Sequence, residues 1–72
     1  MNVKDQENMT AMDMIRAAMK EKGIKSKDFA AMIGKAPSNL SSQMSAGYLK
    51  AEDWRAWADA LGYKVIMIPK EE

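Results

Sequence analysis

The chain has 72 residues, the size of one small domain, and 47% of them are hydrophobic, as in a folded globule. It contains no cysteine and no histidine, which excludes disulfide bonds and thiolate metal sites and removes the commonest general base. The formal net charge of +1 gives no argument by itself for a nucleic-acid partner. No apolar run approaches membrane-spanning length and no signal peptide is visible, so we expect a cytoplasmic protein.

Residues 1–8 are polar and show no periodicity, which predicts a flexible arm that is either loose or reaches toward DNA or a second subunit. The first helix is expected over residues 10–22, because Thr10 can cap its start and Asp13 can complete a capping box. Gly23 is placed to end this helix in a left-handed conformation. The inward face is predicted from residues at helical spacing: Ala11, Met12, Ile15, Ala18, Met19 and Lys22.

Residues 26–47 predict two short helices joined by a tight turn. Ser26 is expected to cap the first of them, over residues 27–33, and Gly34 lies where the turn needs a positive φ. The second helix is expected over residues 37–46, because proline fits a first turn and Gly47 suits a helix end. The first helix is expected to carry the apolar residues Phe29, Ala30, Met32 and Ile33.

The second of these helices has an unusual outward face. Leu40 and Met44 are four residues apart and therefore share the inward face. The opposite side carries only short, uncharged, hydrogen-bonding residues: Ser38, Asn39, Ser41, Ser42 and Gln43. A surface helix normally carries lysine and glutamate, whereas a face of this kind suits the donors and acceptors on the floor of a DNA major groove.

The charge distribution agrees with this interpretation better than the net charge does. No acidic residue occurs between Asp28 and Glu52, while Lys35 and Lys50 lie in the same interval. The predicted reading surface is therefore free of negative charge, as a phosphate-lined partner requires. A chance gap in the charge pattern is the alternative explanation.

A fourth helix is predicted over residues 51–61, followed by a stop at Gly62. Trp54, Trp57, Ala58 and Leu61 form a continuous apolar stripe on it. Because the two tryptophans are in phase with Leu61, we interpret them as packing residues rather than as platforms on which bases stack.

The last predicted element is a strand over residues 63–68, since this apolar run follows Gly62 and ends at Pro69. A lone strand has unpaired backbone groups, which favours pairing with the same strand of a second copy across a two-fold axis. The alternative is a strand that lies on the helices of its own subunit. The residues expected in the dimer interface are Tyr63, Val65, Ile66, Met67 and Ile68.

Three features of residues 26–47 carry a resemblance: the pair Phe29–Ala30, Gly34 four residues after Ala30, and Leu40 six residues after Gly34. With them the segment resembles the helix-turn-helix of Cro and phage-repressor-like (XRE-type) DNA-binding domains. The likeness extends over residues 10–65 and implies a mainly α, four-helix, lambda-repressor-like fold in a single domain, residues 1–72. Two positions depart from the pattern: Lys35 where an apolar residue is usual, and Pro37 where a base-reading residue often stands.

The resemblance implies a sequence-specific regulator that binds double-stranded DNA, a repressor that recognises a palindromic operator as a homodimer. The expected base contacts are Pro37, Ser38, Asn39, Ser42 and Gln43. The expected phosphate contacts are Lys25, Ser26, Lys27, Lys35 and Ser41, with simple solvated side chains as the alternative. No cofactor, metal, small-molecule ligand or catalytic activity is expected. The alternative function is a protein-interaction module, such as a helix-turn-helix antitoxin or an adaptor.

Overall fold

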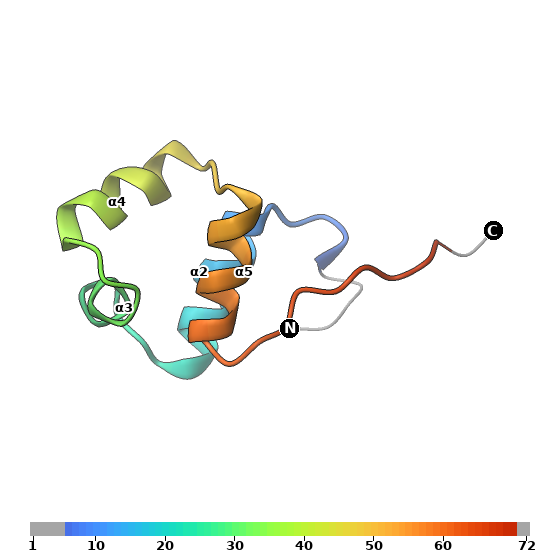
Figure 1. The fold of residues 1–72 in the computed structure, drawn as a ribbon, viewed down its shortest axis with the longest axis horizontal. Coiled ribbons are helices and arrows are strands. Elements are labelled where there is room, and N and C mark those ends of the chain that lie inside the picture. The colour runs from blue at the N-terminus through green and yellow to red at the C-terminus, as the bar shows by residue number, and fades with distance from the viewer. Residues whose placement is uncertain (1–5, 71–72) are drawn as a thin grey trace.

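The computed structural model describes residues 6–70, and in this range the chain forms an all-α domain of four helices without strands. They are α2 (Ala11–Lys22), α3 (Ser26–Met32), α4 (Pro37–Ala46) and α5 (Ala51–Ala60). The helices pack as two pairs, α2 with α5 and α3 with α4. Figure 1 shows α3 and α4 at one end of the molecule, whereas the segment after α5 leads away at the other end. None of the helices within residues 6–70 is long and apolar enough to cross a bilayer.

Helix α2 begins and ends where its local signals predict. The Thr10 hydroxyl oxygen accepts a hydrogen bond from the Asp13 N–H at 3.1 Å, and the Asp13 carboxylate accepts one from the Thr10 N–H at 3.3 Å. This reciprocal pair confirms the predicted capping box. Gly23 follows in the left-handed conformation, and its N–H donates to the Lys20 carbonyl oxygen at 3.2 Å.

The bounds of the other helices agree with the prediction to within one residue. Helix α4 covers the predicted residues, with Pro37 in its first turn and Gly47 in the left-handed conformation at its end. The predicted cap at Ser26 is wrong: Lys25 is the extended residue before α3, and no side chain caps that helix. Ser26 is already helical, so its hydroxyl is not at the position from which an N-cap accepts a hydrogen bond.

One core joins the two helix pairs. The largest completely buried side chains are Met12, Ile15, Phe29 and Leu40. Phe29 of α3 meets Trp57 of α5 edge to face, with the ring centroids 5.6 Å apart and the planes at 87°. This contact confirms a packing role for Trp57. Of the apolar residues of α3, Phe29 and Ala30 are buried, whereas Met32 is 48% exposed.

The chain after α5 is anchored at Tyr63 and then extends without regular structure. The Tyr63 N–H donates to the Ala58 carbonyl oxygen at 2.8 Å, and its hydroxyl donates to Oε2 of Glu21 at 2.6 Å. The Lys22 ammonium lies 5.3 Å from the centre of the tyrosine ring, within cation–π distance. The hydrogen bond to Glu21 raises the pKa of Tyr63, and partial desolvation and the charge of Glu21 add to the effect.

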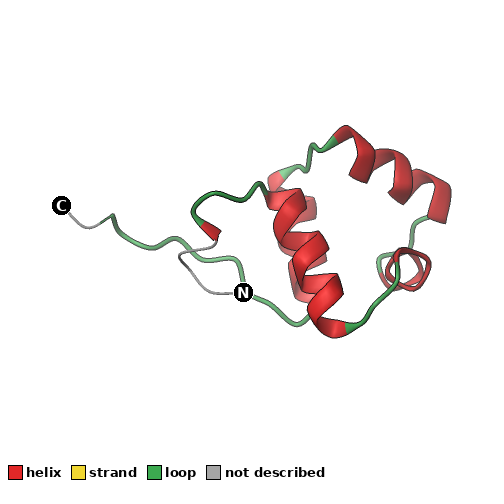
Figure 2. Cartoon of the chain, turned by 180° about the vertical axis from the view of Figure 1, so that it is seen from behind, coloured by secondary structure: helices red, strands yellow, loops and turns green. Residues whose placement is uncertain are grey.

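The strand predicted over residues 63–68 is not present in the structure, as Figure 2 shows. A strand needs the backbone of a neighbour to complete its hydrogen bonds, and within residues 6–70 the chain offers no other strand. The predicted flexible arm, residues 1–8, lies mostly outside the described residues. Of its described part, the Gln6 carbonyl oxygen accepts a hydrogen bond from the Met9 N–H at 3.1 Å.

Candidate nucleic-acid interface

Helix α4 presents its polar side to solvent. Leu40 is completely buried and Met44 packs against the core, so these two residues define the inner side of the helix. The residues predicted to contact bases lie away from it: Pro37, Ser38, Asn39 and Ser42 are exposed, and Gln43 is half-buried. Ser41, predicted to contact phosphate, is exposed on the same helix. The described surface of α4 carries no charged side chain.

The turn between α3 and α4 is tight and depends on Gly34. This residue has φ +71°, and a Cβ atom added there would have no neighbour within 4 Å. The Lys35 N–H donates to the Ala30 carbonyl oxygen at 2.9 Å, and the Gly34 N–H donates to that of Ala31 at 3.3 Å. These bonds satisfy carbonyl groups at the end of α3 while the chain reverses direction. The positive φ expected at Gly34 is confirmed.

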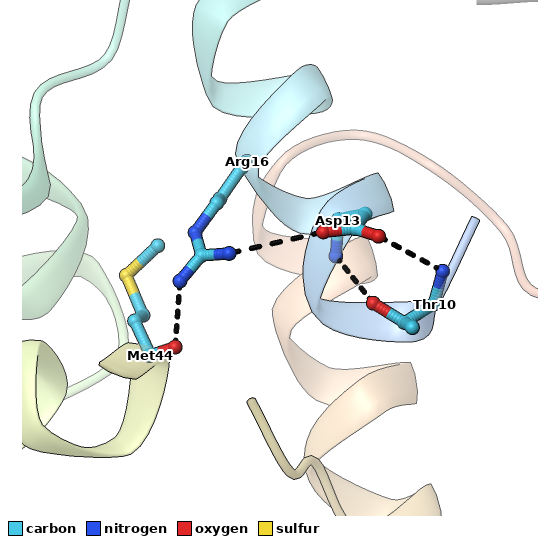
Figure 3. A network of polar contacts seen from close by, with 4 residues as sticks. All are labelled: Thr10, Asp13, Arg16 and Met44. Carbon is cyan, nitrogen blue, oxygen red and sulfur yellow. Dashed lines mark hydrogen bonds and ion pairs between the residues drawn. The ribbon is translucent and has the colours of Figure 1, made fainter. Parts of the chain in front are cut away.

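The far end of α4 is connected to α2 by a side chain that the sequence did not single out. Nη2 of Arg16 donates a hydrogen bond to the Met44 carbonyl oxygen at 2.6 Å (Figure 3). Nη1 of Arg16 lies 3.8 Å from a carboxylate oxygen of Asp13, one turn earlier on the same helix. The spacing of Asp13 and Arg16 is a visible signal for their ion pair. The contact with Met44 joins residues 28 positions apart and has no local signal.

The predicted phosphate contacts do not form one cluster. Lys25 and Ser26 line an open hollow between α2, the start of α3 and the end of α4. Two further cations that were not predicted, Arg16 and Lys20, lie on the same hollow. Lys27, the residue after Ser26, is exposed but does not line the hollow. Lys35 is half-buried at the turn before α4 and does not line it either. The basic surface therefore includes α2 as well as α3.

The residues predicted for a dimer interface lie beside a second, apolar hollow. This hollow has a volume of about 360 Å³ between α2, α5 and the segment after α5. Tyr63, Val65, Ile66 and Ile68 help to line it, whereas Met67 does not and is 97% exposed. Ile66 and Ile68 are also largely exposed, at 69% and 60%. A single chain therefore leaves much of this apolar segment in water.

The part of the chain that the structure describes shows no candidate metal site, and comparison with known proteins gives no match. Within residues 6–70, no three histidine, cysteine, aspartate or glutamate side chains gather in a way that could hold a metal ion. No protein family, curated protein or solved structure matches this chain. The arguments for a function therefore rest on the residues and their geometry.

Proposed function

We propose that this chain is a sequence-specific DNA-binding regulator, a repressor that inserts α4 into the major groove of double-stranded DNA. The observation that carries the proposal is the outward face of α4, which is exposed, uncharged and made of short hydrogen-bonding side chains. The pairing of two short helices, α3 and α4, across a tight turn at Gly34 is compatible with a helix-turn-helix. It supports the likeness to XRE-type domains that the sequence carries.

Asn39 and Gln43 would carry most of the sequence discrimination. Their amide groups can bind the N6 and N7 edge of adenine through two hydrogen bonds, and each such contact is worth about 1–3 kcal/mol. The serines of α4 can donate or accept and so discriminate less. Because α4 has no arginine to bind guanine, we expect modest intrinsic specificity. Exposed cations such as Lys25 and Lys27 would bind phosphates and fix the register of the protein on the duplex.

The proposed active form is a homodimer in which the segments over residues 63–68 pair as antiparallel strands. The support is the exposed apolar surface of Ile66, Met67 and Ile68, which pairing would cover. Figure 1 shows this segment and α4 at opposite ends of the molecule. The two α4 helices would then read half-sites one helical turn, about 34–36 Å, or a multiple of it apart.

The test is selection of bound duplexes from a random-sequence library at two salt concentrations, with sedimentation velocity of the same protein. We expect a palindrome to be enriched, steep salt dependence and a dimer. Replacing Asn39 by Ala should relax one position in each half-site and weaken binding by about 1–3 kcal/mol. Ser45→Ala is the matched control, because Ser45 is an exposed residue of α4 outside the predicted base contacts, and it should change the DNA affinity little. A library that shows no enrichment at low salt would refute DNA reading.

The second candidate function is a protein-interaction module, such as an antitoxin or an adaptor. The specific observation in its favour is again the exposed apolar segment after α5. Three results together would favour this function over the first. The protein would be a monomer, the selection would enrich no duplex, and residues 63–68 would bind a different protein in a stoichiometric complex.

A further inference from the structure

Arg16 is the middle of a polar network that begins at the cap of α2 and ends on α4 (Figure 3). Its guanidinium donates to the Met44 carbonyl oxygen at 2.6 Å and lies 3.8 Å from Asp13. Asp13 is itself held in place by its two hydrogen bonds with Thr10. The planar guanidinium can face both acceptors at once, which an ammonium group cannot do in the same way. The network therefore connects a fixed point on α2 with the backbone of α4.

The end of α4 lacks a cation of its own. Its last turn has no basic residue, although the last carbonyl groups of a helix carry partial negative charge. The Met44 carbonyl oxygen accepts a hydrogen bond from the Gly47 N–H at 3.2 Å, and its second lone pair accepts the one from Arg16. The cation that approaches these carbonyl groups is Arg16 from α2. This position suits a positive charge. It also adds a polar contact at the end of α4 to the apolar contacts that Leu40 and the Met44 side chain make with the core.

We propose that Arg16 is a positioning residue, which sets the orientation of α4 relative to α2 and thereby aims the outward polar face. The inference rests on the proposed DNA-reading function of α4. Leu40 and the Met44 side chain attach the inner side of α4 to the core through apolar contacts, which have no preferred direction. The hydrogen bond from Arg16 has a preferred direction, so it restrains the orientation of the end of the helix. Two bidentate base contacts tolerate little rotation of the helix, because each needs both hydrogen bonds at good geometry.

A different role would also place Arg16 here. The side chain is about half exposed and lines the open hollow with Lys20 and Lys25, so it could bind a phosphate directly. The two roles predict different dependence on sequence and on salt. A phosphate contact adds the same affinity to every duplex and contributes about 0.9 to the salt slope. A positioning contact affects only the duplex that α4 reads.

The experiment compares Arg16→Ala with Arg55→Ala, which removes the same charge from an exposed position on α5. Each variant is titrated with the duplex enriched in the selection and with a random duplex, at several salt concentrations. We expect Arg16→Ala to weaken binding of the enriched duplex about tenfold, the loss of one good base contact. The affinity of Arg16→Ala for the random duplex, and the slope of its binding constant against salt concentration, should equal those of Arg55→Ala. An equal loss on both duplexes, with a slope lower by about 0.9, would instead assign Arg16 to phosphate.

A measurement on the free protein separates this inference from the proposed function. Residual dipolar couplings of backbone amides give the direction of α4 relative to α2 without DNA. We expect α4 to change direction in Arg16→Ala and to keep its direction in Arg55→Ala. Arg16→Lys, which keeps the charge on a single donor nitrogen, should restore the direction in part. Unchanged couplings in Arg16→Ala would overturn the positioning role. Failure of the wild-type protein to enrich any duplex would refute DNA reading, and the couplings would still decide whether Arg16 orients α4.

Discussion

Leu40 anchors α4 in the core, and Leu40→Ala tests how much this anchor contributes to the stability of the domain that presents the outward polar face of α4. Leu40 is the buried residue of α4, at 0% exposure. The change removes three carbon atoms from the core, and the lost transfer free energy is about 2.4 kcal/mol at about 0.8 kcal/mol for each. A cavity that does not collapse raises the loss to about 3–5 kcal/mol. In a domain of this size each kcal/mol lowers the melting temperature by about 4–8 °C.

The free energy of unfolding is measured by urea denaturation, followed by circular dichroism and by tryptophan fluorescence. Trp57 is a useful probe because it contacts Phe29 in the same core. Leu40→Met is the matched control, since it nearly conserves volume and should cost less than about 1.5 kcal/mol. If Leu40→Ala lost less than about 1 kcal/mol, or no more than Leu40→Met, the core would not be what holds α4 in place.

Two further predictions concern the turn before α4 and the segment after α5. Gly34→Ala should destabilise the domain by about 1–2 kcal/mol through backbone strain alone, because a Cβ there meets no neighbour. Gly34→Asn should cost less, since asparagine tolerates a left-handed backbone, and equal losses in thermal melts would refute this explanation. The pKa of Tyr63 should lie above its ordinary value of 10.0 and return toward it in Glu21→Gln, followed by NMR of ¹³Cζ-labelled tyrosine with Tyr63→Phe to assign the signal. Because the pKa of Tyr63 is raised in the folded state, the stabilisation from its hydrogen bond to Glu21 is present below pH 10 and is lost as the pH rises through the folded pKa. An unchanged pKa of Tyr63 in Glu21→Gln would contradict the assigned cause.

Local signals in the sequence were sufficient to predict most of the helical structure. Pro37 and Gly47 mark the two ends of α4, and Thr10 with Asp13 marks the start of α2. Such signals act over three or four residues, so they can be read without knowing the fold. Helix α3 has only 7 residues, too few for periodicity to show which of its apolar residues face the core, and the structure leaves Met32 48% exposed.

The remaining errors and omissions have tertiary or quaternary causes. The apolar, β-branched and aromatic run over residues 63–68 is typical of a strand, but a strand forms only where a second backbone completes its hydrogen bonds. The sequence gives no signal for the contact of Arg16 with α4, because its partner there is a backbone carbonyl group, which any residue would supply. The identity of Met44 therefore carries no information about the contact. Predictions of base and phosphate contacts depend on DNA geometry and stay predictions.

The pairing of the helices also sets the order in which the domain can assemble. Helices α3 and α4 are separated by 4 residues, so their association closes a very short loop. Helices α2 and α5 are separated by 28 residues, and closing that loop costs about 3 kcal/mol of chain entropy. We therefore expect the α3–α4 pair to associate early and the meeting of α2 with α5 to limit the folding rate. The contact between Phe29 and Trp57, which bridges the two pairs, would then form late.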